Sequence, residues 1–97
     1  MAIRSFARAE VERFYRTGEV HRRCGWAGVT RVVARKLDLV AYAHVLDDLR
    51  APPGNRLEAL KGEMKGRHSI RVNDQWRIVF VWTPAGAEQV DVVDYHG

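Results

Sequence analysis

The chain contains a single cysteine, Cys24, among its 97 residues. A disulfide within the chain is therefore impossible, and we expect a reducing compartment. Cys24 also lacks the neighbouring cysteines and histidines of a zinc site and the local signature of a cysteine protease. No apolar run approaches the roughly 20 residues of a membrane span, and the start of the chain lacks the apolar core of a signal peptide. We therefore expect a cytoplasmic protein without a membrane partner.

Several motifs of cofactor-dependent and metal-dependent enzymes are also missing. The sequence has no Walker loop, no G-x-G-x-x-G and no H-E-x-x-H. It has no acidic cluster of the kind that holds two metal ions in a nuclease. The four histidines are scattered without metal-ligand spacing, at His21, His44, His68 and His96. We therefore expect no metal and no cofactor.

The charge is unevenly distributed along the chain, whose formal net charge is +4. Residues 1–36 carry a net charge of +6, and residues 61–77 carry +3. The segments between and after them are acidic, with −2 over residues 37–60 and −3 over residues 78–97. The basic segments suit a phosphate backbone or an acidic protein partner. A mixed, solvated surface would give the same counts.

Helical spacing of apolar residues occurs twice in the first half of the chain. It covers residues 8–17, after which Gly18 fits a helix stop. It returns over residues 28–49, where one stripe has the spacing of a buried helix face: Val29, Val33, Leu37 and Val40. The stripe fails after Ala43, so the helix either buries a wide face or breaks near Ala43–His44 before a short separate turn. We favour the break.

The second half of the chain has the alternation of β-strands. It is clearest at residues 75–82, where Arg77 faces away from the apolar Trp76 and Ile78. Asn73-Asp74 fits a tight hairpin turn before this strand. The expected strands cover residues 57–60, 68–72, 75–82 and 89–95, with another possible at residues 2–6. Helices early and strands late predict an α+β fold in which the helices cover one sheet face, within a single domain of residues 1–97.

The chemistry of the chain is concentrated in basic side chains near these strands. Lys61 and Lys65 lie in a glycine-containing loop, and Arg77 either reaches solvent on an open sheet face or points into a concave site. Tyr95-His96 is either a frayed tail or a source of a phenol and an imidazole. The 2′-OH of RNA can attack its own adjacent phosphate, so cleavage needs only orientation, positive charge, a base and an acid. These side chains are compatible with that reaction.

Several segments together resemble the HigB branch of the RelE/ParE superfamily, the plasmid-maintenance killer proteins of type II toxin–antitoxin systems. The resemblance is carried by IRSFA, ERFYRTG, LDDLRAPPGNRLEALKG, HSIRVNDQWRIVFVW and VDYHG. It implies a RelE-like small antiparallel β-sheet with N-terminal helices packed on one face. It also implies a ribosome-dependent mRNA endonuclease that leaves a 2′,3′-cyclic phosphate, and a HigA-type helix-turn-helix antitoxin as partner. The alternatives are a ParE-like toxin that inhibits DNA gyrase and a non-catalytic antitoxin-binding remnant.

The same resemblance implies roles for individual residues. Lys61 matches the lysine of the family's LKG and Arg77 the arginine of its WR, and both are expected to contact the phosphate. Tyr95 would stack on a base or position the RNA, and His96 is a candidate general acid or base. Some members carry histidine where this chain has Glu58, so the base is either Glu58 or His96. The RNA-binding candidates are Lys65, Arg67, His68 and Arg71.

Overall fold

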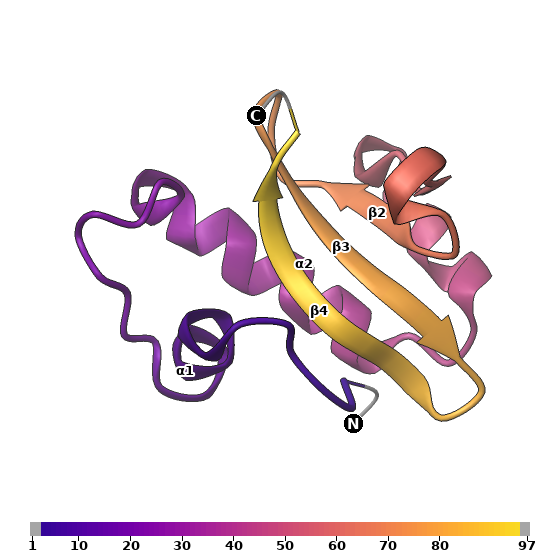
Figure 1. Cartoon of the computed structure of the whole chain (residues 1–97), viewed down its shortest axis with the longest axis horizontal. Helices are drawn as coiled ribbons and strands as arrows, with labels where there is room; N and C mark the ends of the chain where they lie inside the picture. The colour runs from indigo at the N-terminus through magenta and orange to yellow at the C-terminus, as the bar shows by residue number, and fades with distance from the viewer. Residues whose placement is uncertain (1–2, 96–97) are drawn as a thin grey trace.

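The computed structural model describes residues 3–95 and contains two α-helices, four β-strands and several short 3₁₀-helices (Figure 1). The helices are α1 (Ala9–Thr17) and α2 (Thr30–Tyr42), and the strands are β1 (Glu58–Ala59), β2 (His68–Arg71), β3 (Trp76–Thr83) and β4 (Gly86–Asp94). The 3₁₀-helices are η1 (Ala27–Val29), η2 (Leu46–Arg50), η3 (Pro53–Asn55) and η4 (Gly62–Met64). The strands form one antiparallel sheet in the order β1-β2-β3-β4.

Helix α1 follows its predicted pattern. It buries Val11 and Phe14 against the core, and Gly18 ends it in a left-handed conformation with φ of 79°. The Gly18 N–H donates to the Phe14 carbonyl at 2.8 Å, which satisfies one of the last carbonyl groups of the helix.

The predicted break after α2 is confirmed. The helix ends at Tyr42, Ala43 is extended, and the short helix η2 follows. The carboxylate of Asp48 holds this break, because it accepts the backbone N–H groups of His44 at 2.9 Å and Val45 at 3.2 Å. These two hydrogen bonds lower the pKa of Asp48 below its ordinary value.

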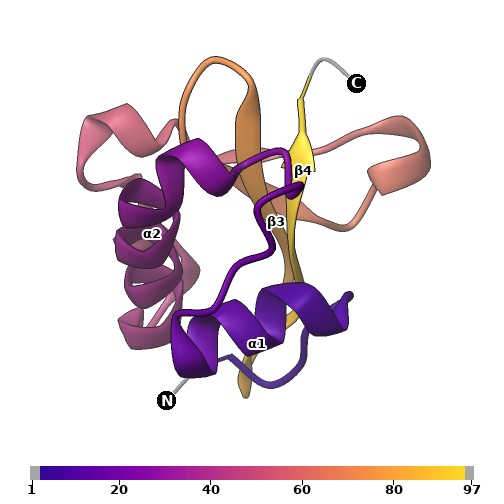
Figure 2. The same ribbon diagram turned by 90° about the vertical axis from the view of Figure 1, so that its left-hand side faces the viewer.

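The helices cover one face of the sheet, as predicted. In Figure 1 helix α2 passes behind β3 and β4, and Figure 2 shows α2 beside these strands while α1 crosses in front of their lower part, where it contacts β4. The core between the layers is fully buried and includes Val33, Leu37, Val40, Ile70, Ile78, Phe80, Val90 and Val92. The protein therefore has an α+β fold, and within residues 3–95 the other sheet face carries no α-helix.

Two local predictions differ from the structure. The turn at Asn73-Asp74 is wider than a two-residue hairpin, because β2 ends at Arg71 and β3 starts at Trp76. The side chain of Asn73 closes this loop by accepting the backbone N–H groups of Gln75 and Trp76 at 2.9 and 2.8 Å. These two hydrogen bonds to the Asn73 side chain hold the loop closed, as backbone hydrogen bonds would in a two-residue turn.

The last strand is longer than expected. It starts at Gly86 and absorbs an irregularity at Gln89, whose φ is 52°, where the pairing with β3 shifts between Val79 and Val81. The segment at residues 2–6 is no regular strand within the described part, but Ile3 and Phe6 make isolated parallel bridges to β4. No helix within residues 3–95 has the length and the apolar character to cross a membrane.

Candidate active site

The sheet face without helices gathers polar side chains from three strands. Residues directly opposite each other in an antiparallel sheet point to the same face, and every second residue along a strand does so too. Glu58 pairs with Ser69, and Arg71, two residues further along β2, pairs with Arg77. Glu58, Ser69 and Arg77 therefore share the face opposite to the buried Ile70 and Ile78.

The guanidinium of Arg77 is the centre of this group. Its Nη1 lies 2.9 Å from a carboxylate oxygen of Glu58 and donates to Ser69 Oγ at 3.2 Å and to the Arg56 carbonyl at 3.4 Å. Only 7% of Arg77 is exposed, which rules out the solvated arginine that was one of the two alternatives. An arginine this well buried needs a partner for its charge, and Glu58 provides it.

Tyr95 closes the group from the end of β4. The Arg77 guanidinium carbon lies 4.3 Å from the centre of the Tyr95 ring, in the geometry of a cation–π contact. The Tyr95 hydroxyl is 3.5 Å from Glu58 Oε1, and the Tyr95 N–H donates to the Gln75 carbonyl at 2.6 Å. Glu58, Arg77 and Tyr95, which are far apart in the sequence, thus meet in one place.

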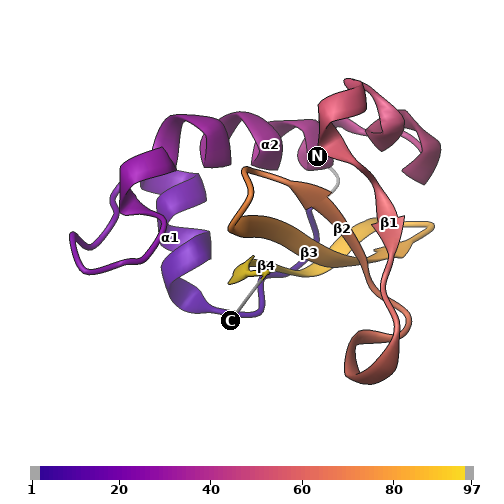
Figure 3. The same ribbon diagram turned by 90° about the horizontal axis from the view of Figure 1, so that it is seen from above.

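Lys61 and Lys65 are exposed in the loop that connects β1 to β2. The Leu60 N–H donates to the Arg67 carbonyl at 2.8 Å and closes this loop at its base. Figure 3 shows that the loop extends from the sheet on the side opposite to α2, which is the side of Arg77. Within residues 3–95 Lys61 makes no ion pair or side-chain hydrogen bond, so the structure places it near this face without joining it to the Arg77 group.

The other RNA-binding candidates fall on both faces. Arg71 shares the open face with Arg77 and pairs with Asp74, and Arg67 donates to the side chain of Gln89 at 2.7 Å. His68 instead lies on the helix-covered face, where its ring stacks on Phe80 with 6.4 Å between ring centres. The structure therefore brings Arg71 to the open face but not His68, and the binding roles of Arg67, His68 and Arg71 remain predictions. His96 lies outside the described residues.

Sequence reasoning missed two contributors to the site. Ser69 is fully buried and accepts from Arg77, and its position two residues before Arg71 on β2 was the signal that could have found it. The Arg56 carbonyl carries no comparable signal, because its orientation depends on a left-handed backbone with φ of 47° at a non-glycine residue. Within residues 3–95 no three His, Cys, Asp or Glu side chains lie close enough to hold a metal ion.

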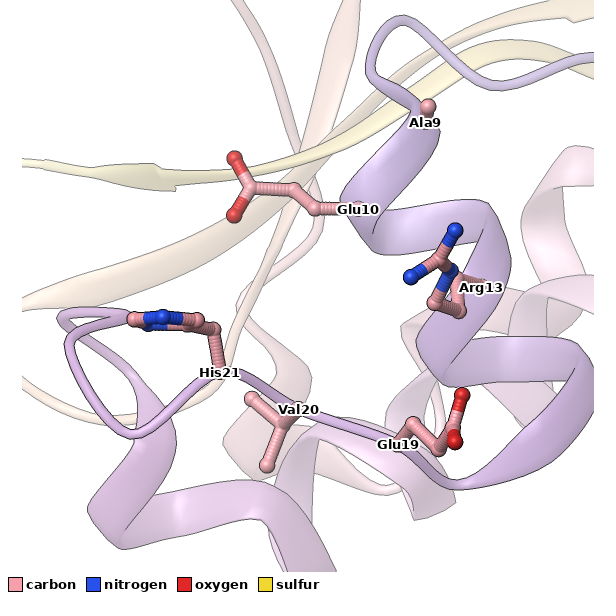
Figure 4. Close-up of a pocket in the computed structure, with 6 residues that line it drawn as sticks. All are labelled: Ala9, Glu10, Arg13, Glu19, Val20 and His21. Carbon is pink, nitrogen blue, oxygen red and sulfur yellow. The ribbon is translucent and has the colours of Figure 1, made fainter.

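A hollow of about 570 Å³ lies away from this site, between α1 and the loop after it (Figure 4). Its lining side chains have mixed charge, and Figure 4 shows them on both sides of the opening: Ala9, Glu10, Arg13, Glu19, Val20 and His21. None of the predicted site residues lines this hollow, so the hollow is separate from the candidate active site.

Comparison with known proteins agrees with the fold and the motifs. The profile of the family described as the RelE-like toxin of type II toxin–antitoxin system HigB matches residues 4–96. The chain is 43% identical to toxin HigB-1 of Vibrio cholerae serotype O1 over 72 residues, which are 74% of this chain and 75% of that protein. It is 40% identical to an uncharacterized protein of Haemophilus influenzae over 68 residues, which are 70% of this chain and 66% of that protein.

A solved structure of a YoeB/ParE toxin from Agrobacterium tumefaciens is also similar. It aligns over 97% of this chain and 94% of that chain, with 18% identity and a TM-score of 0.48. The match of the family profile over nearly the whole chain and the identity to a HigB toxin carry the assignment. The chain therefore belongs to the HigB family of RelE-like toxins in type II toxin–antitoxin systems, which implies that its partner is an antitoxin.

Proposed function

We propose that this toxin is a ribosome-dependent mRNA endonuclease that blocks translation in the cytoplasm and is neutralised by a HigA-type helix-turn-helix antitoxin. In this proposal the 2′-OH attacks the adjacent phosphate, the bond to the 5′-oxygen breaks, and a 2′,3′-cyclic phosphate remains. The single observation that supports it best is the meeting of Glu58, Arg77 and Tyr95 on the open sheet face of a HigB-family chain.

Arg77 would stabilise the charge that develops on the phosphorane. A guanidinium has five N–H donors in a planar fork that matches phosphate oxygens. The hydrogen bonds of Arg77 within residues 3–95 all use Nη1, so Nε and Nη2 remain for a phosphate. The ring of Tyr95 covers the guanidinium and is 49% exposed, so RNA binding would move this ring from the arginine onto a base.

Glu58 would take the proton of the 2′-OH. Its carboxylate is already positioned by Arg77 and approached by the Tyr95 hydroxyl, and both contacts use the same oxygen, Oε1. The side chain of Glu58 is 44% exposed, which leaves its second oxygen open to the ribose. In this proposal His96 would be the acid that protonates the leaving 5′-oxygen.

The remaining basic residues would hold the RNA backbone. Lys61 and Lys65 are exposed on their loop, Arg67 precedes β2, and Arg71 shares the open face with Arg77, so we expect these four positive charges to contact the RNA phosphates. Such charges neutralise phosphates without reading the sequence. Among them Lys61 is the candidate for direct contact with the reacting phosphate.

The test is to express the chain without its antitoxin and to map the 5′ ends of cellular RNA. We expect growth arrest and new 5′ ends within translated messages, which disappear when translation initiation is blocked. The variants Lys61→Ala and Arg77→Ala should relieve the arrest, while Arg16→Ala, which removes an exposed arginine on α1, should not. Intact messages together with damaged DNA would contradict the proposal in favour of gyrase inhibition, and absence of arrest would indicate a non-catalytic remnant.

A further inference from the structure

Ser69 stands where the side chain of Arg77 crosses the sheet. Strand β2, which carries Ser69, lies between β1 and β3 (Figure 3). The Cα partners of Ser69 are Glu58 on β1 and Val79 on β3, so the three side chains point to the open face. Arg77 comes two residues before Val79 and points to the same face. The arginine therefore reaches Glu58 by passing over β2 beside Ser69.

The small size of the serine side chain permits this crossing. Ser69 is 0% exposed, and the Nη1 atom of Arg77 lies 3.2 Å from its Oγ. A longer side chain at this position would point to the same face and occupy the space in which Nη1 lies. It would then separate Arg77 from Glu58, whose carboxylate lies 2.9 Å from the same nitrogen. The ion pair between β1 and β3 therefore requires a small residue at position 69.

The hydroxyl of Ser69 is one of three acceptors that share Nη1. The others are the Glu58 carboxylate at 2.9 Å and the Arg56 carbonyl at 3.4 Å, so Ser69 is the nearer of the two neutral acceptors. The Glu58 side chain is 44% exposed, and water therefore competes for its ion pair with Arg77. Ser69 is shielded from water, so its hydrogen bond depends less on solvent than the ion pair does.

The hydrogen bond to Ser69 matters most once Glu58 has taken a proton. In the proposed reaction the carboxylate removes the proton of the 2′-OH and becomes neutral, which weakens its attraction for the guanidinium. The arginine must nevertheless still face the phosphorane. A serine hydroxyl stays neutral throughout, so Ser69 accepts from Nη1 equally before and after the proton transfer. It also leaves the positive charge of Arg77 available to the phosphate.

We propose that Ser69 is a positioning residue for Arg77, which keeps the guanidinium in place while Glu58 changes its protonation state. The inference rests on the proposed function, because it gives Ser69 a role in the same reaction. Ser69 is fully buried beneath the guanidinium, so we expect it to contact neither the ribose nor the phosphate. Its effect on the reaction passes through Arg77.

The first experiment follows the Arg77 side chain of the full chain by ¹⁵N NMR and does not depend on cleavage. The rotation rate of the guanidinium reports how firmly its hydrogen bonds hold it, and Glu58→Gln models the neutral carboxyl group. Rotation should be less than about threefold faster in Glu58→Gln than in wild type, but about tenfold faster again when Ser69→Ala is added, since a hydrogen bond to a charged group is lost.

Ser5→Ala is the matched control for this measurement. The Ser5 hydroxyl accepts the backbone N–H of Gln89 at 2.9 Å, and Ser5 is exposed in the segment before α1. Its removal should leave the rotation of Arg77 unchanged. Equal rotation rates in Glu58→Gln and in the double variant with Ser69→Ala would overturn the role of Ser69.

The second experiment measures single-turnover cleavage of message on ribosomes. Ser69→Ala should lower the rate at saturating ribosome concentration by about tenfold, while the half-saturating concentration stays within about twofold of wild type. Threonine keeps the hydroxyl, valine has the same shape without it, and both suit a β-strand. Ser69→Thr should therefore cleave about fivefold faster than Ser69→Val, a comparison that serves if Ser69→Ala does not fold. Equal rates in these two variants would contradict the proposal.

The two proposals can fail separately. If Arg77→Ala loses cleavage but Ser69→Ala keeps the wild-type rate, the role of Ser69 is wrong and the endonuclease proposal stands. If Ser69→Ala frees the arginine in the Glu58→Gln background but the wild type produces no new RNA ends, Ser69 still positions Arg77 and the endonuclease proposal is wrong.

Discussion

The Nη1 atom of Arg77 lies 2.9 Å from the Glu58 carboxylate although the two residues stand on strands that are separated by β2. The ion pair therefore spans two inter-strand spacings, which are about 4.8 Å each. It fixes the arginine along the sheet surface, where Ser69 and Tyr95 can also contact it. The relationship makes Glu58 a positioning group for Arg77 as well as a candidate base.

Loss of the arginine should slow cleavage strongly. We expect Arg77→Ala to reduce the rate of RNA cleavage by about 10²–10³-fold, the usual cost of removing one donor to a developing oxyanion. Arg77→Lys keeps the positive charge but loses the planar set of N–H donors of the guanidinium. This variant should therefore still cleave RNA more than about tenfold more slowly than wild type. The measurement is single-turnover cleavage of message on stalled ribosomes, with circular dichroism to establish that each variant is folded. Full activity in Arg77→Lys would show that only the charge matters.

The identity of the base can be read from the pH dependence of cleavage. If Glu58 takes the proton, Glu58→Gln should slow cleavage by about 10²–10⁴-fold and remove the fall in rate at acid pH. His96→Ala should then keep the acid limb and lose the alkaline one. The opposite pattern, with the acid limb lost only in His96→Ala, would make His96 the base and leave Glu58 with its positioning role.

Tyr95 is predicted to act through its ring. The ring lies over Arg77 at 4.3 Å, whereas its hydroxyl is a marginal 3.5 Å from Glu58. Tyr95→Phe should therefore keep cleavage within about threefold of wild type, since it preserves the cation–π contact and the surface for stacking. Tyr95→Ala should lose much more. A large loss in Tyr95→Phe would instead show that the hydroxyl takes part in proton transfer.

The elements of the fold were largely predictable because each depends on local pattern. The spacing of Val33, Leu37 and Val40 indicated α2 and its failure after Ala43 indicated the break, which the structure confirms. The alternation around Ile78 likewise indicated β3. These patterns predict the elements correctly because they place apolar residues on the faces that are buried in the core.

The geometry of the site was only partly predictable because it depends on register between distant strands. Family motifs pointed to Arg77 and Tyr95, but no sequence pattern pairs Glu58 with Ser69, and that pairing brings the carboxylate to Arg77. Alternation did place His68 on the same strand face as Ile70. Only the packing on Phe80 showed that this face is the covered one.

A buried lysine should contribute to stability although it takes no part in the site. Lys36 is 6% exposed, and its ammonium group donates to the side chain of Asn55, which is fully buried. Lys36→Met keeps most of the volume but leaves the Asn55 oxygen unpaired, so it should reduce the free energy of unfolding by about 1–3 kcal/mol. Urea denaturation at neutral pH measures this, and Arg35→Met on the exposed side of α2 is the matched control.

The difference in stability between wild type and Lys36→Met should also depend on pH. Burial, together with the positive charges of Arg35 and Arg71, lowers the pKa of Lys36 from its ordinary 10.5. The unfolded chain then binds more protons than the folded one in the alkaline range below 10.5. The stability of wild type relative to Lys36→Met should therefore rise as the pH increases through that interval. A difference that stays constant with pH would contradict the lowered pKa.

Antitoxin binding should depend on salt. Residues 1–36 carry a net charge of +6, and the exposed side chains of Arg22 and Arg23 belong to this segment. An antitoxin that meets this surface with acidic groups should associate about tenfold more slowly when the salt concentration rises from 0.05 to roughly 0.5 M, because screening weakens electrostatic steering.

The paired substitution Arg22→Glu with Arg23→Glu should slow association at low salt and reduce its salt dependence, whereas Arg50→Glu, which changes an exposed arginine of η2 outside the basic segment, should do neither. Stopped-flow or surface-based kinetics with the protein encoded beside this gene provides the measurement. Association that is insensitive to both salt and charge reversal would indicate an apolar interface instead. The dissociation rate, which reports close packing more than steering, would then be the quantity that mutations at the true interface change.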